Sequence, residues 1–171
     1  MKYRRQMLTV ITVGALLVAL SPSAAFEAVA ATGDNKCYRF RPAEKSFRWK
    51  INRSRVRAGK SRLKLDPELG KVARVHARKM AREGSIFHQS SSQLGSRVTR
   101  WSTLGENVGV GSTPTSLHKA FMRSPGHKAN IMYSAFRNVG VGTVRKNGRL
   151  YVTVIFESRL NPGTRLSMPK C

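Results

Sequence analysis

Acidic residues are scarce in this sequence. It contains 32 Lys and Arg against 8 Asp and Glu, which gives a formal net charge of +24 at pH 7. A field of this sign attracts polyanions such as nucleic acid, anionic wall polymers, acidic glycans and anionic lipid surfaces. The sequence also lacks an aromatic stacking pattern and any recognised nucleic-acid motif, which argues against a specific nucleic-acid partner. Because the charges are spread along the chain, a basic surface with no preferred partner is the alternative interpretation.

A long hydrophobic run is missing as well. The first uncharged stretch, residues 7–20, has 14 residues and follows a basic start, K-Y-R-R at residues 2–5. A membrane-spanning helix needs about 20 apolar residues. The short run and the small residues in A-V-A at 28–30 are typical of a signal peptide and its cleavage site, and S-A-A at 23–25 is a second candidate site. We therefore predict that residues 1–30 are removed on secretion, with an uncleaved membrane anchor as the alternative.

Cysteine occurs only twice, as Cys37 and Cys171. A secreted protein meets an oxidising compartment in which disulfides persist, so we predict a disulfide between these two residues, with two unpaired thiols as the alternative. The polar segment 31–45 is predicted to be irregular, and residues 46–171 to form one domain. Without residues 1–30 the chain keeps 29 basic and 7 acidic side chains, a balance of +22.

Two helices are predicted in the first half of the domain. Residues 46–58 form the first, with Phe47, Trp49 and Ile51 facing inward. The second begins at D-P-E, residues 66–68, which supplies a capping Asp, a Pro at the first helical position and an acid near the positive end of the helix dipole. It extends to about residue 82, and its apolar face carries Leu69, Val72, Ala73, His76 and Met80 at helical spacing.

The second half of the domain has less periodicity. Residues 85–115 contain few regularly spaced apolar positions, which predicts a long ordered loop or a run of short elements. A helix is expected from T-P at 113–114 to Arg123, with His118 on its exposed face. Two β-prone stretches, 139–144 and 150–156, flank the turn signal N-G. Helices followed by a hairpin are typical of an α+β fold.

Common hydrolase signatures are absent. There is no H-E-x-x-H, and the serines at 90–92 lack the G-x-S-x-G pattern. Three other residues stand out: His88, Glu106 in G-E-N-V-G, and His127 in S-P-G-H-K-A-N-I. Imidazoles and a carboxylate can bind a divalent metal or exchange protons near neutral pH. Spacing alone does not show that these three side chains meet.

Taken together, these segments resemble the CAP superfamily, which comprises cysteine-rich secretory proteins, antigen 5 proteins, plant pathogenesis-related proteins and their bacterial secreted relatives. The resemblance covers roughly residues 47–157. It includes I-N-R-S-R at 51–55, the segment 63–69, V-G-V-G at 139–142 and Y-V-T-V-I-F from residue 151. It implies an α-β-α sandwich with a small central antiparallel sheet flanked by helices, and a third strand inside residues 85–112.

The resemblance also implies a binding cleft formed by His88, Glu106 and His127, with Asn107 and Ser124 beside it. Ser124 stands where the family often has a second Glu, so the site is a His-Glu-His triad at best. His88, Glu106 and His127 are the candidate ligands of a divalent metal such as zinc. In the alternative interpretation, the three side chains only hydrogen-bond each other and hold residues 85–115 in place.

The leading functional interpretation is a secreted, monomeric, non-enzymatic module. It would bind a lipid or a metal ion in the His/Glu cleft, and anionic cell-envelope polymers or lipids through its basic surface. The alternative is a metal-dependent, protease-like hydrolase in which two His and one Glu leave a coordination position open for water. No separate general base is evident in the sequence, which favours the first interpretation.

Overall fold

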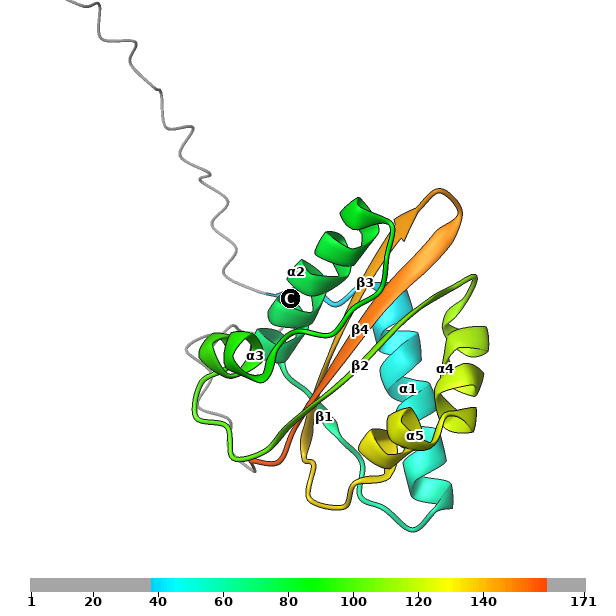
Figure 1. Cartoon of the computed structure of the whole chain (residues 1–171). Coiled ribbons are helices and arrows are strands. Elements are labelled where there is room, and N and C mark those ends of the chain that lie inside the picture. Colours follow the sequence, from blue (N-terminus) through cyan, green and yellow to red (C-terminus); the bar gives the residue numbers. More distant parts are fainter. Residues whose placement is uncertain (1–37, 160–171) are drawn as a thin grey trace, which may run out of the picture. The chain divides into compact units, whose positions relative to one another are not determined.

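The computed structural model describes residues 38–159 (Figure 1). The predicted signal peptide, residues 1–30, lies outside the described residues, and so do Cys37 and Cys171, so cleavage and the disulfide stay predictions. In chain order the elements are α1 (Pro42–Arg57), β1 (Lys64–Leu65), α2 (Pro67–Glu83), α3 (Ser91–Arg97), β2 (Leu104–Gly111), α4 (Pro114–Arg123), α5 (Pro125–Met132), β3 (Asn138–Lys146) and β4 (Arg149–Glu157).

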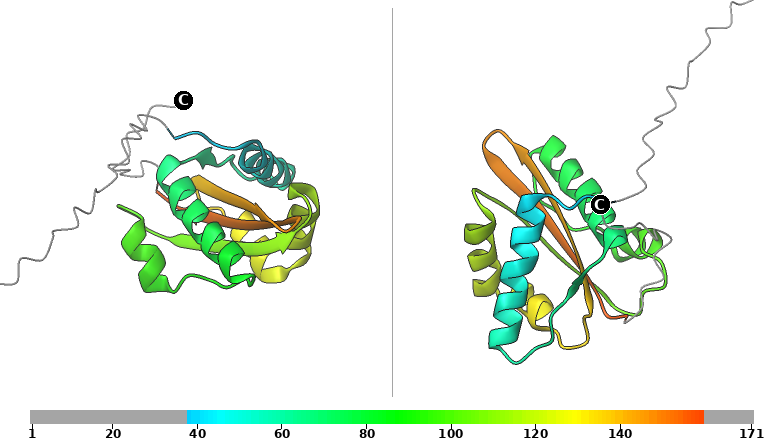
Figure 2. Two further views of the ribbon diagram at one scale, coloured as in Figure 1. Left: turned by 90° about the horizontal axis from the view of Figure 1, so that it is seen from above. Right: turned by 180° about the vertical axis from the view of Figure 1, so that it is seen from behind.

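The four strands form one sheet in the order β1-β3-β4-β2. β3 and β4 are a hairpin, and β2 pairs with β4 in antiparallel register. The short β1 pairs with β3 in parallel, so the predicted antiparallel sheet has one parallel edge strand. Helices α2 and α3 cover one face, while α1, α4 and α5 cover the other (Figures 1 and 2). The α-β-α sandwich and the strand expected inside residues 85–112 are therefore confirmed.

The central strand β4 explains how the two layers share one core. Successive side chains of a strand point to opposite faces of the sheet. Toward α1, α4 and α5, the strand directs Leu150, Val152, Val154 and Phe156, and toward α2 it directs Tyr151 and Ile155. All six are buried, which is why residues 150–156 show an almost continuous apolar run rather than an alternating one.

Two glycines of V-G-V-G let α2 rest directly on β3. A Cβ atom on Gly140 would lie 2.1 Å from the carbonyl carbon of Leu69, and one on Gly142 would lie 2.1 Å from the backbone nitrogen of Arg74. No side chain fits at either position, so only glycine permits this close approach of backbone to backbone. The motif thus positions α2 and the segment that follows it, which carries His88.

The predicted start of α2 is confirmed, while that of α1 is wrong. Asp66 caps α2 by accepting a hydrogen bond from the backbone nitrogen of Leu69 at 2.8 Å. Helix α1 begins at Pro42, inside the segment predicted to be irregular, because the Glu44 carboxylate accepts a 2.8 Å hydrogen bond from the backbone nitrogen of Arg41 and caps this start. Trp49 is 52% exposed, contrary to the prediction that it faces inward.

His76 is buried, as predicted, but the exposed position predicted for His118 is wrong. Helix α4 packs against α1, and Nε2 of His118 lies 2.9 Å from the hydroxyl oxygen of Ser54. Burial, with the nearby Lys50 ammonium, lowers the pKa of His118 from 6.5 to about 4. His118 is therefore a neutral residue of the helical layer at physiological pH.

A buried arginine ties the helical layer together. The guanidinium of Arg55 is fully buried and donates to the backbone carbonyls of Ser61, Ile131 and Tyr133 at 2.7–2.9 Å. Burial lowers its pKa from the ordinary arginine value. These bonds connect α1 to the end of α5, the helix that carries His127.

None of the helices within residues 38–159 is long and apolar enough to cross a membrane.

Candidate functional site

The predicted cleft residues come from strand β2, which is an edge of the sheet, and from two segments beside it. Glu106 belongs to β2, and His88 lies in the connection between α2 and α3. His127 belongs to α5, a short helix that the sequence did not predict; His127 was expected just beyond a helix end. Ser124 ends α4 and starts α5. The fold therefore assembles the site from segments that are well separated in the chain.

Glu106 is the centre of a hydrogen-bond network. One carboxylate oxygen accepts from Nδ1 of His88 at 2.9 Å and from the backbone nitrogen of Gln89 at 3.0 Å. The other oxygen accepts from Nε2 of Gln89 at 2.8 Å. Oε1 of Gln89 in turn accepts from a guanidinium nitrogen of Arg97 at 2.7 Å. The side chain of Glu106 is only 5% exposed, so its carboxylate is held by donors from His88 and Gln89 rather than by bulk solvent.

These bonds also fix the orientation of His88. Its Nδ1 must carry a proton to donate to the carboxylate, so the other ring nitrogen, Nε2, is the one left to interact with a ligand. The side chain of His88 is 57% exposed, so that nitrogen is accessible. Glu106 therefore determines which ring nitrogen of His88 is presented to the cleft.

His127 is held by its backbone rather than by its ring. Nδ2 of Asn107 donates to the carbonyl oxygen of His127 at 3.0 Å, and Nδ2 of Asn130 donates to Oδ1 of Asn107 at 2.9 Å. The ring packs against Phe121, with 4.7 Å between centroids. Burial, with the neighbouring His88, lowers the pKa of His127 below its usual value, which favours the neutral imidazole.

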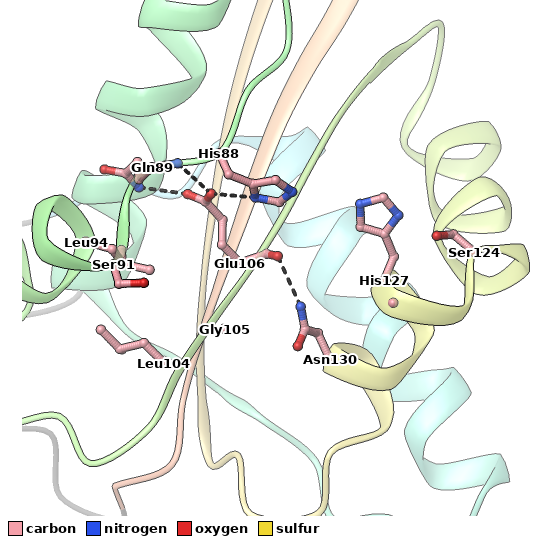
Figure 3. Close-up of a pocket in the computed structure, with 11 residues that line it drawn as sticks. His88, Gln89, Ser91, Leu94, Leu104, Gly105, Glu106, Ser124, His127 and Asn130 are labelled. Atoms are coloured by element: carbon pink, nitrogen blue, oxygen red, sulfur yellow. Dashed lines mark hydrogen bonds and ion pairs between the residues drawn. The ribbon is translucent and has the colours of Figure 1, made fainter.

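The two imidazoles lie on opposite sides of one cleft, which has a volume of about 550 Å³. Figure 3 shows their rings facing each other across it, with Ser124 at the far edge and Asn130 on the floor. Leu94 and Leu104 add an apolar portion to the wall. The cleft thus combines two ring nitrogens, polar walls and a small apolar patch.

The arrangement differs from the predicted set of three metal ligands. Within residues 38–159, no group of three or more His, Cys, Asp and Glu side chains is placed so that it could hold a metal ion. The reason lies in Glu106, whose oxygens are engaged by His88 and Gln89 and do not extend between the two rings. The side chains that remain available as ligands are His88 and His127.

A family model described as the cysteine-rich secretory protein family, CAP, matches residues 50–156. The chain belongs to the CAP family. The uncharacterized protein YkwD of Bacillus subtilis is 34% identical to this CAP chain over 100 residues, which are 54% of the chain and 39% of YkwD. The chain therefore matches less than half the length of this relative.

Solved structures with the CAP fold include two bacterial proteins. An outer surface protein of Borrelia burgdorferi aligns with a TM-score of 0.62 at 20% identity, over 67% of this chain and 91% of that one. An extracellular protein with an SCP domain from Bacillus anthracis aligns with a TM-score of 0.61 at 24% identity, over 68% and 40%. At these identities the likeness shows the fold.

The structure brings four of the five predicted cleft residues of this CAP chain together around one cleft. His88, Glu106, Ser124 and His127 all line the cleft. Asn107 is completely buried and does not line it, because its amide is used to anchor His127 and Asn130.

Gln89 and Asn130 are among the cleft residues that the sequence analysis missed. Gln89 carried no signal beyond its place next to His88. Asn130 did carry one, because it follows His127 by three positions in the same short motif, a spacing that places both on one side of a helix.

Proposed function

We propose that this protein is a non-enzymatic extracellular binding module whose cleft takes a divalent cation, such as zinc, between the rings of His88 and His127. One observation carries the proposal: Glu106 binds Nδ1 of His88, and this leaves Nε2 facing the ring of His127 (Figure 3). A carboxylate that accepts from the far nitrogen of an imidazole fixes the tautomer and the orientation of the ring as a metal ligand.

The donor set suits a borderline cation. Neutral imidazole nitrogen is a preferred ligand of zinc, and the lowered pKa of His127 favours its neutral form. Two protein ligands leave the remaining coordination positions to water or to an anionic ligand in the cleft. The chemistry that a bound cation would supply is therefore the binding of an anion or a carbonyl oxygen, while Glu106 and Asn107 hold the two histidines in place.

The same geometry disfavours the metal-dependent hydrolase. A hydrolase of this type needs a base that can take a proton from a metal-bound water. Glu106 is the carboxylate of the cleft, and three donors from His88 and Gln89 already occupy its oxygens. Binding therefore accounts for the arrangement better than hydrolysis does.

The basic surface supplies the second part of the proposal. Without residues 1–30 the chain has a charge balance of +22, which attracts anionic components of a cell envelope, and its CAP family is one of secretory proteins. The predicted removal of residues 1–30 belongs to the same proposal. Mass spectrometry of secreted protein would then find a chain that begins near Ala31, whereas an intact Met1 in the membrane fraction would indicate an anchor.

Thermal unfolding with added zinc tests the cleft. A cation that binds the native state raises the melting temperature in a dose-dependent way. We expect this response in the wild-type protein, its loss in His127→Ala, and its retention in His118→Gln, which alters a histidine outside the cleft. If zinc has no effect, and His127→Ala lowers the melting temperature equally with and without zinc, the histidines are structural and the cation proposal is wrong.

A further inference from the structure

A second cavity lies at the opposite edge of the sheet, beside β1. It has a volume of about 940 Å³ and is lined by residues 38–40, 45, 48 and 62–65; we call it the β1 groove. Its lining residues come from the amino-terminal half of α1, the segment that precedes α1 and the segment that includes β1. Five of its nine lining residues are basic and none is acidic: Arg39, Lys45, Arg48, Arg62 and Lys64.

These five cations have no acidic partner in the part of the chain that the structure describes. The one acid of α1, Glu44, is fully buried and does not line the groove: it accepts from the guanidinium of Arg74 at 2.6 and 2.9 Å and from the backbone nitrogen of Thr143 at 3.3 Å. The positive charge of the groove is therefore available to a ligand.

Arg48 gives a more local sign of a missing partner. Its Nε atom is buried and has no hydrogen-bond acceptor among the residues that the structure describes. A buried donor left without an acceptor destabilises a fold, so such atoms are uncommon in folded proteins. An oxygen of a ligand in the groove would satisfy this donor. Burial of the donor thus distinguishes Arg48 from an ordinary solvated surface arginine.

The basic lining continues past the groove along α1. A smaller cavity of about 240 Å³ is lined by Trp49, Arg53, Val56, Arg57 and Arg62, and Arg62 lines both cavities. Arg53 lies over the ring of Trp49, with 5.1 Å between the guanidinium carbon and the ring centroid. The two hollows together form an elongated track of basic side chains, which suits an extended chain better than a compact ligand or a flat bilayer.

The composition of the track indicates the chemistry of that chain. Guanidinium groups pair with phosphate through two parallel hydrogen bonds, and arginine is the main cation of both cavities. Stacking of bases is poorly supported, because Tyr38 packs edge-on against Phe40 at 4.8 Å and lies under Arg74 at 4.4 Å. A strand of nucleic acid needs several exposed aromatic rings as a stacking platform. Of the three aromatic residues that line the two cavities, only Trp49 is exposed.

We infer that the β1 groove and its extension bind a linear, base-free polymer of phosphodiesters, of which poly(glycerol phosphate) is the simplest probe. The inference rests on the proposed binding of anionic envelope components and assigns that binding to one place. Phosphates along the polymer would meet the arginines in turn, and the polyol between them would need no specific pocket.

The test compares two double variants of the full chain that remove the same charge. Arg48→Gln with Arg62→Gln alters the track, while Arg82→Gln with Arg149→Gln alters exposed residues outside both cavities. At about 0.15 M salt we expect the track variant to lose about tenfold in affinity for poly(glycerol phosphate) and the control variant about twofold or less. The slope of log affinity against log salt should fall by about 1–2 in the track variant, because fewer counterions are released.

Arg48→Lys with Arg62→Lys keeps the charge, so it should bind more weakly than the wild-type protein but more tightly than the glutamine pair. If the polymer binds and both glutamine pairs lose equally, the groove inference is wrong while the proposed anionic binding stands. If neither the polymer, single-stranded DNA nor phosphatidylglycerol vesicles bind, the proposed anionic binding itself fails. Tighter binding of DNA or vesicles than of the polymer, with loss in the track variant, would overturn the ligand class.

Discussion

The charged side chains at the two edges of the sheet differ in how they are bonded to the rest of the described chain. At the β2 edge, the carboxylate of Glu106 receives three hydrogen bonds from His88 and Gln89, and Gln89 is itself fixed by Arg97. At the β1 edge, five cations line one groove, and the neighbouring Glu44 is committed to Arg74. The first region uses its charges to hold its geometry, whereas no ion pair between residues 38 and 159 engages the groove cations of the second.

This difference predicts effects of opposite sign. Removing a charged group from the cleft strips donors of their partner, and buried polar groups without partners destabilise a fold. Removing a charged group from the groove relieves repulsion between like charges and takes no partner away. Stability measurements on the two edges therefore test the comparison directly, without any ligand.

The largest effect is expected for Glu106→Ala. The substitution leaves Nδ1 of His88 and two donors of Gln89 without their acceptor, so we expect the free energy of unfolding to fall by about 3 kcal/mol, as measured by urea denaturation. The free energy of unfolding of Glu106→Gln should lie between those of the wild-type protein and Glu106→Ala. The amide oxygen of the new Gln side chain still accepts a hydrogen bond, while its amide nitrogen faces the amide nitrogen of Gln89. A loss below about 0.5 kcal/mol would mean that the cleft charges hold nothing in place.

A smaller effect is expected at Glu157, a buried acid that lacks such donors. From the described residues its carboxylate accepts one long hydrogen bond, 3.4 Å from Nδ2 of Asn138, and its other oxygen accepts none. Burial, with the charges of Asp66 and Glu68, raises its pKa from 4.5 to about 7. The fold therefore favours the protonated form of Glu157.

The direction of the pH effect follows from that shift. Well below pH 4.5, Glu157 is protonated in both the folded and the unfolded chain, and the folded state has the full stabilisation that comes from protonated Glu157. As the pH rises toward 7 the unfolded chain releases the proton first, so the free energy of unfolding falls. We expect wild type to lose about 2 kcal/mol relative to Glu157→Gln over this interval, as measured by urea denaturation of both proteins. Parallel pH profiles for the two would contradict the assignment, and Glu83→Gln, at an exposed acid, should follow the wild-type profile.

What the sequence could predict depended on whether the signal was local. The cap at Asp66 and the apolar stripe from Leu69 to Met80 specify α2 by themselves, and the structure has that helix. His118 was misplaced because its burial depends on α1, a helix about 60 positions earlier that supplies Ser54. Helix α5 is eight residues long and has no apolar periodicity, so the region around His127 looked like the end of α4.

The site shows the same limit. His88, Glu106 and His127 were found through the resemblance of their motifs to a family, and their spacing alone could not have joined them. The role of Glu106 could not be predicted, because its partner Gln89 is defined by the path of the chain after α2. The β1 groove was out of reach as well, since it needs the segment 38–40, α1 and β1 to meet in space. The sequence revealed the excess of basic charge but not where that charge goes unpaired.

The smallest effect is expected in the β1 groove, and its sign matters more than its size. Arg62→Gln with Lys64→Gln removes two exposed cations that line the same cavity and have no ion-pair partner within residues 38–159. At about 0.01 M salt, where charges interact over about 30 Å, we expect a rise of about 1 °C in Tm. Near 1 M salt, screening shortens that range to about 3 Å, and the difference from the wild-type protein should disappear. Thermal unfolding at the two salt concentrations measures both values. A fall in Tm that is independent of salt would show that these cations have partners on the chain, as the charges of the cleft do, and the contrast between the two edges would be lost.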